Sequence, residues 1–416
     1  MERVDEAPDD VSRRMTISQI RTNAMLPVID HDFVSVPGIS LAPASGNQHT
    51  SAVKDRWHTQ DARQLDVGLH CTDDCMWCTG EVAVRELSRS GRFAFVAPDS
   101  RITPVPLGKA TFLDSPRCED LSILDADVAI LGVPFGYPYD LSGLTSPSAS
   151  APAALREASV RMAPFITHYD YDFGADIFNG RTVRVVDCGD VAMKPGDFAG
   201  NFDATTTAVK AILDRGAVPI ILGGDHAIPI PVFQAYEGQE PMVVVQLDQH
   251  IDWRQERNGV SRGLSSTMRR ASEMPWVKGM AQVGLHMMGS ARQGEVDDAV
   301  AWGSVHVRAE DIHEKGVDWV LDQIPESSRY YITFDADGLF SGIAPGVLAP
   351  GFGGLTYYEA SNILRGLARK GKIVGYDIVE IVPSVDVQNL TSQVCARLTL
   401  NLLGEMAHQG QIGTAK

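Results

Sequence analysis

The chain has 416 residues, of which 44% are hydrophobic and 21% are charged, as in globular proteins. Its formal net charge of −17 argues against nucleic acid as a partner and favours cationic ligands. Six cysteines are too few for a disulfide framework, and the acidic first ten residues are unlike a secretory signal or a transit peptide. No apolar run reaches the roughly 18 residues of a membrane span. We therefore expect a cytoplasmic protein that binds neither membranes nor nucleic acid.

Residues 1–125 show no helical or strand periodicity and are interrupted by proline and glycine. We interpret them as an N-terminal extension that wraps the following domain or a neighbouring subunit. Within them, one histidine and three cysteines have a spacing at which thiolates can hold a metal cluster or zinc: His70, Cys71, Cys75 and Cys78. Because no domain that would use such a cluster follows, we favour a structural role for the cysteines, with metal binding as the alternative.

After residue 125, short β-rich runs alternate with stretches of helical length. Eight runs predict strands, and most are apolar throughout, as in parallel strands covered on both faces. They are residues 128–133, 183–186, 218–222, 242–247, 281–285, 304–307, 330–334 and 373–376. Helices are expected between them, for example at 204–215 and at 357–370, the second with Thr356 as N-cap and Gly371 as C-cap. Alternating strands and helices predict a parallel α/β sheet.

Acidic residues and histidines follow four of these strands directly, at the ends where parallel sheets bind ligands. The four segments are Gly-Gly-Asp-His at 223–226, Asp-Gln-His-Ile-Asp at 248–252, Asp-Ala-Asp at 335–337 and Asp-Ile-Val-Glu at 377–380. Alternate residues of an extended segment point to the same side, so the donors of each segment should converge. Two histidines and four carboxylates suit two ions, and this mixed set favours manganese, iron, nickel or zinc over calcium or magnesium. Two such ions about 3.5–4 Å apart can share a water and lower its pKa.

These segments, in this order and with similar spacing, resemble those of the ureohydrolase family of arginases, agmatinases and related guanidino hydrolases. Further similarity lies at residues 131–135, 344–346 and 353–355. The resemblance covers residues 126–405, which we take as the catalytic domain, and leaves residues 406–416 as a C-terminal tail. It implies a three-layer α/β/α sandwich with an eight-stranded parallel sheet.

The resemblance also implies a binuclear centre, usually of manganese, with nickel as the alternative. Its metal ligands would be His226, Asp248, His250, Asp252, Asp335 and Asp337. The reaction would be hydrolysis of a C–N bond in a guanidino or amidino compound by hydroxide that bridges the ions, with release of urea or an analogue. Glu380 matches the acid that meets the guanidinium, and we assign proton relay to Asp252. Family members are commonly trimers or hexamers, so we expect a homo-oligomer.

The substrate loop departs from the family pattern. Agmatinase- and arginase-type sequences carry a His-Gly pair after the Asp-x-His-x-Asp segment, whereas residues 253–285 contain no histidine. His286 is our candidate to replace it in catalysis, and the alternative is an ordinary loop histidine. Gln249 stands where the family has alanine, and Phe340-Ser341 where it has Asp-Pro. Trp253 and Phe340 either line an apolar pocket or serve in packing.

Two other functions fit parts of the pattern. An amide hydrolase related to the deacetylases would use a single zinc, and would not need the additional pair His226 and Asp337. A non-catalytic subunit of a hetero-oligomeric hydrolase would fit the missing loop histidine, but not six intact ligands. We therefore expect an agmatinase-like hydrolase of a small cationic guanidino substrate whose identity is left open.

Overall fold

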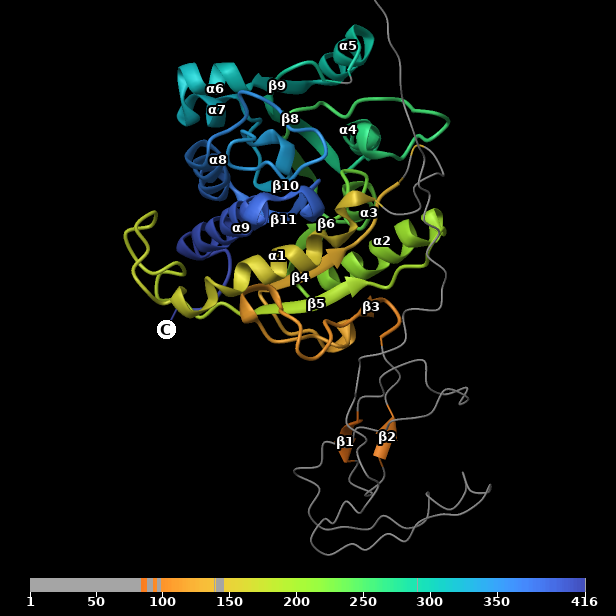
Figure 1. Cartoon of the computed structure of the whole chain (residues 1–416), viewed down its shortest axis with the longest axis vertical. Coiled ribbons are helices and arrows are strands. Elements are labelled where there is room, and N and C mark those ends of the chain that lie inside the picture. The colour runs from red at the N-terminus through yellow and green to blue at the C-terminus, as the bar shows by residue number, and fades with distance from the viewer. Residues whose placement is uncertain are drawn as a thin grey trace, which may run out of the picture. The chain divides into compact units, whose positions relative to one another are not determined.

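The structure is a computed structural model, and it describes residues 84–87, 93–95, 99–137, 139, 146–289 and 291–415. The cysteines at 71, 75 and 78 lie outside the described residues. Strands β1, Val84–Leu87, and β2, Phe93–Phe95, form an antiparallel pair. From residue 99 onwards the described chain contributes to one large sheet and the helices that cover it (Figure 1).

The central sheet has nine strands in the order β3-β5-β4-β6-β11-β10-β7-β8-β9. Eight of them are parallel: β4 Val128–Val133, β5 Val185–Val191, β6 Val218–Gly223, β7 Met242–Leu247, β8 Val277–Leu285, β9 Ser304–Arg308, β10 Arg329–Asp335 and β11 Lys372–Val379. All eight predicted strands are present, which confirms the α/β prediction. The ninth, β3 Ile102–Thr103, pairs antiparallel with β5. The sheet is therefore mixed rather than wholly parallel, because residues ahead of the predicted domain add an edge strand.

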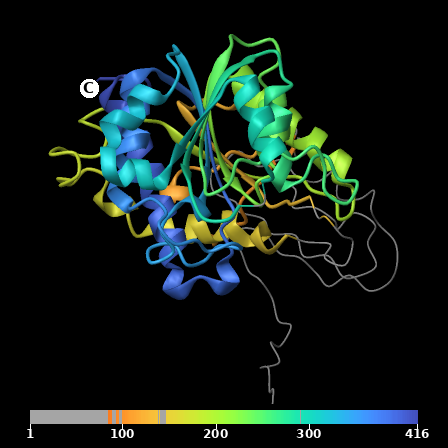
Figure 2. The same cartoon turned by 90° about the horizontal axis from the view of Figure 1, so that it is seen from above.

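Helices cover both faces of the sheet, so the fold has three layers (Figure 2). One layer holds α1 Ala151–Val160, α6 Ala309–Lys315, α7 Val317–Gln323, α8 Tyr357–Lys370 and α9 Leu390–His408. The other holds α2 Phe198–Asp214, α3 Pro229–Gln234, α4 Thr267–Ser272 and α5 Gln293–Trp302. Along β4, Val128 and Ile130 pack towards the first layer, and Ala129 and Leu131 towards the second. The continuous apolar runs of the sequence follow from this burial on both faces.

Local signals set the helix boundaries. Helix α8 has the predicted bounds because Thr356 and Glu359 form a capping box, in which each side chain accepts a hydrogen bond from the other's backbone N–H. Helix α2 begins six residues before the predicted start at residue 204. The reason is Asp197, whose side chain accepts a hydrogen bond from Gly200 N and caps the helix there.

The strand order brings together the segments that carry the acids and histidines. Strands β6, β11, β10 and β7 are neighbours in this order in the middle of the sheet, which differs from their order in the chain. Their carboxyl ends meet at one edge because they are parallel. Close backbone approach at this edge requires glycine: a Cβ on Gly224 would lie 1.7 Å from Phe135 O, and one on Gly338 2.9 Å from Asp248 Cα.

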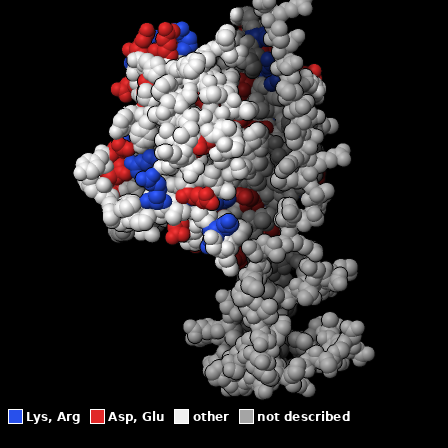
Figure 3. Space-filling view, viewed as in Figure 1, with Lys and Arg blue, Asp and Glu red and all other residues white. Residues whose placement is uncertain are grey.

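Several charged side chains on the described surface form pairs of opposite charge. In the view of Figure 3, acidic and basic residues lie beside each other in separate groups rather than in one continuous patch. Arg397 pairs with Asp170 and Asp172, for example, and Arg308 with Asp311. Among the described residues, no helix combines the length and the apolar character needed to cross a membrane.

Candidate metal centre and substrate pocket

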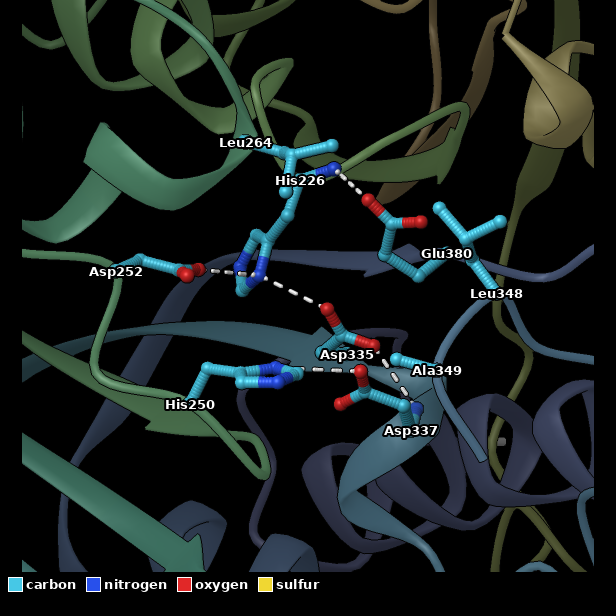
Figure 4. Close-up of a pocket in the computed structure, with 9 residues that line it drawn as sticks. All are labelled: His226, His250, Asp252, Leu264, Asp335, Asp337, Leu348, Ala349 and Glu380. Atoms are coloured by element: carbon cyan, nitrogen blue, oxygen red, sulfur yellow. Dashed lines mark hydrogen bonds and ion pairs between the residues drawn. The ribbon is translucent and has the colours of Figure 1, made fainter. Parts of the chain in front are cut away.

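Side chains from all four strand ends meet in one pocket (Figure 4). It is lined by His226, His250, Asp252, Leu264, Asp335, Asp337, Leu348, Ala349 and Glu380. Of the eight residues that we assigned from sequence to metal binding or catalysis, six line this pocket. A seventh, Asp248, contacts His226 and His250 of that lining. The pocket therefore joins six potential metal donors to the acid expected to meet a guanidinium.

The first donor group surrounds His226, which follows β6. Its Nδ1 lies 2.9 Å from Asp248 Oδ2 and 2.9 Å from Asp252 Oδ2. A third carboxylate oxygen, Oδ2 of Asp335, is 3.1 Å away. Despite these distances, Nδ1 makes no hydrogen bond of acceptable geometry with any of the described residues. A buried ring nitrogen that points between three carboxylate oxygens matches the donor arrangement of a transition-metal site.

The second donor group shares one carboxylate with the first. Asp248 turns its Oδ2 to His226 and its Oδ1 to His250, whose Nδ1 is 3.4 Å from it. Oδ2 of Asp337 lies 3.3 Å from the same His250 nitrogen. Both groups, His226 with Asp248 and Asp335, and Asp248 with His250 and Asp337, are compact enough to hold an ion each. Asp248 is thus placed to bridge two neighbouring ions.

The buried carboxylates of the cluster are stabilised by positive charge placed between them. Burial, together with the neighbouring Asp248, raises the pKa of Asp252 to about 6. Burial alone would lower the pKa of His226, but the surrounding carboxylates raise it well above its usual value. The pKa of His250 is raised to about 12 by Asp248 and Asp337, against the effect of burial. The carboxylates thus favour positive charge at both imidazoles, and two divalent ions would supply the same positive charge.

The second imidazole nitrogen of His226 is also held. Its Nε2 lies 3.0 Å from Thr333 Oγ1, and that hydroxyl donates to Asp377 Oδ1 at 2.7 Å. With Nε2 engaged in this way, Nδ1 is the nitrogen presented to the pocket. Thr333 and Asp377 were not assigned a role from sequence. Thr333 is a polar residue inside an apolar strand run, and Asp377 follows another run directly.

Glu380 and Asp252 both have left-handed backbone conformations, with φ of 64° and 44°. Such angles are unfavourable for residues other than glycine and recur at functional sites. Hydrogen bonds hold both residues: Glu380 N donates to Gly224 O, and Asp252 O accepts from Met268 N. Oε1 of Glu380 accepts from the backbone N–H of His226 at 2.8 Å, and burial with the nearby Asp225 raises the Glu380 pKa to about 8.

His286 lies beside the metal donors rather than in the pocket lining. Its Nδ1 is 2.7 Å from Gly284 O, and its buried Nε2 has no hydrogen-bond partner among the described residues. This nitrogen and Gln249 Oε1 both lie within 2.6 Å of where a Cβ of Gly351 would stand. The Gln249 amide nitrogen is in turn 3.1 Å from His250 Nε2. The backbone N–H of His286 donates to Gln249 O, so that Gln249 lies next to both His286 and a candidate ligand.

The two aromatic residues left open by the sequence differ in environment. Trp253 is 3% exposed and packs with Trp302 in the core, which supports packing rather than pocket lining. Phe340 is 42% exposed and is not among the lining residues. The uncharged wall of the pocket instead comes from Leu264, Leu348 and Ala349, which the sequence did not single out.

The sequence comparison decides the family. Residues 126–404 match the Arginase family. The chain belongs to the arginase family. An arginase-family protein is a ureohydrolase, a hydrolase of linear amidines, and membership implies a binuclear metal centre and a guanidino substrate. The two overlapping donor groups described above agree with this requirement.

Individual relatives lie at moderate sequence identity. The chain is 30% identical to a guanidinobutyrase of Pseudomonas aeruginosa over 303 residues, which cover 71% of this chain and 92% of that protein. It is 30% identical to an agmatinase of Photorhabdus laumondii over 283 residues, 67% of this chain and 87% of that one. Among solved structures, proclavaminate amidino hydrolase from Streptomyces clavuligerus superimposes with a TM-score of 0.63 at 26% identity, covering 72% of this chain and 97% of the other. These similarities place this ureohydrolase with the agmatinase-like members.

Proposed function

We propose that the protein hydrolyses the C–N bond of a guanidino compound with two divalent ions, manganese in the first place and nickel as the alternative. The ligands would be His226, Asp248, His250, Asp252, Asp335 and Asp337. One observation carries the proposal: the two oxygens of Asp248 face two different imidazoles, so that one carboxylate serves two donor groups. A single ion would not need the second group, which argues against the deacetylase-like alternative.

The ions, when bound, would lower the pKa of a water and stabilise negative charge that develops on the substrate. The protein itself orients the guanidinium through Glu380. The backbone N–H of His226 holds one oxygen of this carboxylate, which leaves the other for the N–H groups of the substrate. Asp252 lines the same pocket and would carry a proton between the water and the leaving group as well as binding metal.

For His286 we propose an indirect part in catalysis. Its backbone N–H donates to Gln249 O at 3.3 Å, and the side-chain amide of Gln249 lies 3.1 Å from His250 Nε2. An imidazole in this place would steady the orientation of a ligand rather than meet the substrate. This differs from a direct replacement of the loop histidine that the sequence lacks.

The substrate would carry its guanidino group on an uncharged segment close to the reacting carbon. Leu264, Leu348 and Ala349 form the uncharged part of the pocket wall, next to the acids and Glu380. The printed activities of relatives, guanidinobutyrase and agmatinase, define the compounds to test first.

We also propose that the enzyme works in the cytoplasm as a homo-oligomer, a trimer or hexamer, and that the N-terminal extension takes part in its contacts. Large apolar side chains exposed on the described surface support an interface. Phe165, Tyr169 and Tyr171 are 60%, 65% and 93% exposed and lie close together in the chain.

The test is urea release combined with metal analysis on the purified chain alone. Reconstituted with Mn²⁺, the chain should hold two ions and release urea or an analogue from a guanidino compound. His226→Ala should weaken the binding of one ion and leave the other ion bound. At most one ion in the intact protein would contradict the binuclear proposal, and hydrolysis of an acetylated lysine without any guanidino activity would favour the deacetylase-like alternative. Activity that appears only after a partner subunit is added would favour the non-catalytic alternative.

A further inference from the structure

Polar side chains cross the sheet in one row beneath the candidate metal centre. Gln246 on β7 is in register with Gln282 on β8, which is in register with His306 on β9. Gln246 and Gln282 are 0% exposed, and His306 at the edge strand is half-buried. Buried amides inside parallel strands are costly unless every polar atom is bonded. Their partners therefore indicate what the row does.

The row is a continuous chain of hydrogen bonds that ends on two candidate metal ligands. Gln282 Oε1 lies 3.1 Å from His306 Nε2 and accepts from Ser304 Oγ at 2.9 Å. Gln282 Nε2 donates to Gln246 Oε1 at 2.5 Å. Gln246 Nε2 then donates to Asp248 Oδ2 at 2.6 Å and lies 3.3 Å from Asp252 Oδ2.

The donor-to-acceptor direction of the hydrogen bonds in this row is fixed by one carbonyl group. Gln282 Nε2 also donates to Ile251 O at 2.6 Å, and a carbonyl oxygen can only accept. The Gln282 amide therefore has one orientation, with Oε1 towards His306, so that His306 Nε2 carries the hydrogen. Burial lowers the pKa of His306, which favours the neutral ring, and this bond then places its hydrogen on Nε2. Gln246 must then present its NH₂ to the carboxylates, because its oxygen is taken.

We propose that Gln282, with Ser304 and His306 behind it, is a positioning device for the metal centre: it locks the Gln246 amide so that this amide holds the carboxylates of Asp248 and Asp252 towards His226. The bond from Gln282 to Ile251 O sets the orientation of the Gln282 amide and thereby that of Gln246. The proposal rests on the proposed metal centre. It assigns Gln246 and Gln282 no contact with the substrate.

The geometry also indicates which of the two ions relies on this row of hydrogen bonds for its binding. Both carboxylate oxygens that Gln246 contacts are the ones that lie 2.9 Å from His226 Nδ1. The Asp248 oxygen that faces His250 is its other one, Oδ1. Loss of the row should thus weaken the ion of the His226 group more than the ion of the His250 group.

The experiment is a Mn²⁺ titration of the metal-free full-length chain, with affinities for both ions measured for each variant. Gln282→Met keeps the length of the side chain but removes both amide groups. It should lower the affinity for one ion about 10- to 100-fold, as is usual for groups that hold metal ligands in place, and leave the affinity for the other ion nearly unchanged. The effect should persist in a His250→Ala background and should be small in a His226→Ala background.

A double variant separates positioning from general destabilisation. If Gln282 acts through Gln246, then Gln246→Met/Gln282→Met should bind Mn²⁺ no more weakly than Gln246→Met alone, whereas independent structural effects would add. Thr399→Val on α9 is the matched control, since it also removes a buried polar group, one bonded to Cys395 O, and should leave both affinities unchanged.

The pair Ser304→Ala/His306→Ala provides a second test at the sheet edge, should Gln282→Met fail to fold. It removes both donors to Gln282 Oε1 and should weaken the same ion by a smaller factor. The inference would be overturned if Ser304→Ala/His306→Ala and any folded Gln282→Met protein bound both ions with wild-type affinity. It would also be overturned if the affinities for both ions fell equally. An intact chain that holds fewer than two ions would instead overturn the proposed function.

Discussion

Replacing Glu380 by glutamine removes, with little change of shape, the carboxyl group that a bound guanidinium would hold in its ionised form. The glutamine Oε1 can still accept the hydrogen bond from His226 N, which measures 2.8 Å to the native carboxylate. No candidate metal ligand is altered. The change therefore isolates the attraction between the carboxylate and a guanidinium, and we expect metal content to stay at its native level while turnover falls.

The expected loss follows from burial. Glu380 is 5% exposed, so that water and salt screen its interaction with a bound cation only weakly. A hydrogen bond that involves a charged group contributes about 1.5–3 kcal/mol. With a factor of ten for each 1.36 kcal/mol or so, kcat/KM should fall by roughly one to two orders of magnitude.

Steady-state urea release and metal analysis on the same preparations provide the assay. Glu359→Gln, an equivalent change in the capping box of α8, is the matched control and should leave kcat/KM unaltered. If Glu380→Gln lost metal and activity in parallel, the carboxylate would be a structural support of the metal centre. If it kept native activity, Glu380 would not meet the substrate at all.

Three further outcomes follow from the described residues and from the extension. Burial raises the pKa of Asp225 to about 7 and that of Glu380 to about 8, so both groups bind protons more tightly in the folded protein than in the unfolded chain. The stability of chelator-treated protein should therefore fall as the pH rises from about 4 to about 8. Melting temperatures that stay flat over this range would contradict the raised pKa values. Arg156→Leu leaves the fully buried Asp187 without its ion pair and should cost about 3–5 kcal/mol in urea unfolding, part of which Asp187→Asn should restore; a loss below about 1 kcal/mol would refute this. Deleting residues 1–60 should lower the assembly state or the melting temperature while two Mn²⁺ ions still bind, and a truncated protein with native mass in solution and native melting would show that these residues make no contacts of consequence.

The sequence was informative where local signals decide the structure. The capping box of α8 and the apolar run of β4 predicted their bounds to the residue. The candidate metal donors could also be proposed from sequence, because each lies at or shortly after the end of a predicted strand. Convergence of these donors depends on strand order, which the resemblance to a family supplied and the periodicity of the chain did not.

Other features depend on register and could not be predicted. Gln246 and Gln282 are 36 residues apart and meet only because β7 and β8 pair in one register. Each looked like a single polar interruption of an apolar strand. The closeness of His286 and Gln249 to Gly351 likewise depends on how that loop packs, and no local pattern encodes it.

The order of strands in the sheet has a consequence for synthesis on the ribosome. Strands β6 and β7 follow each other in the chain, yet β10 and β11, which leave the ribosome much later, lie between them in the sheet. A nascent chain that ends before residue 372 lacks the strand that joins β6 to β10, so that His226 has no fixed position relative to Asp335 and Asp337. Pairings over such sequence distances form slowly. The ability to hold two ions is therefore among the last properties that the growing polypeptide acquires.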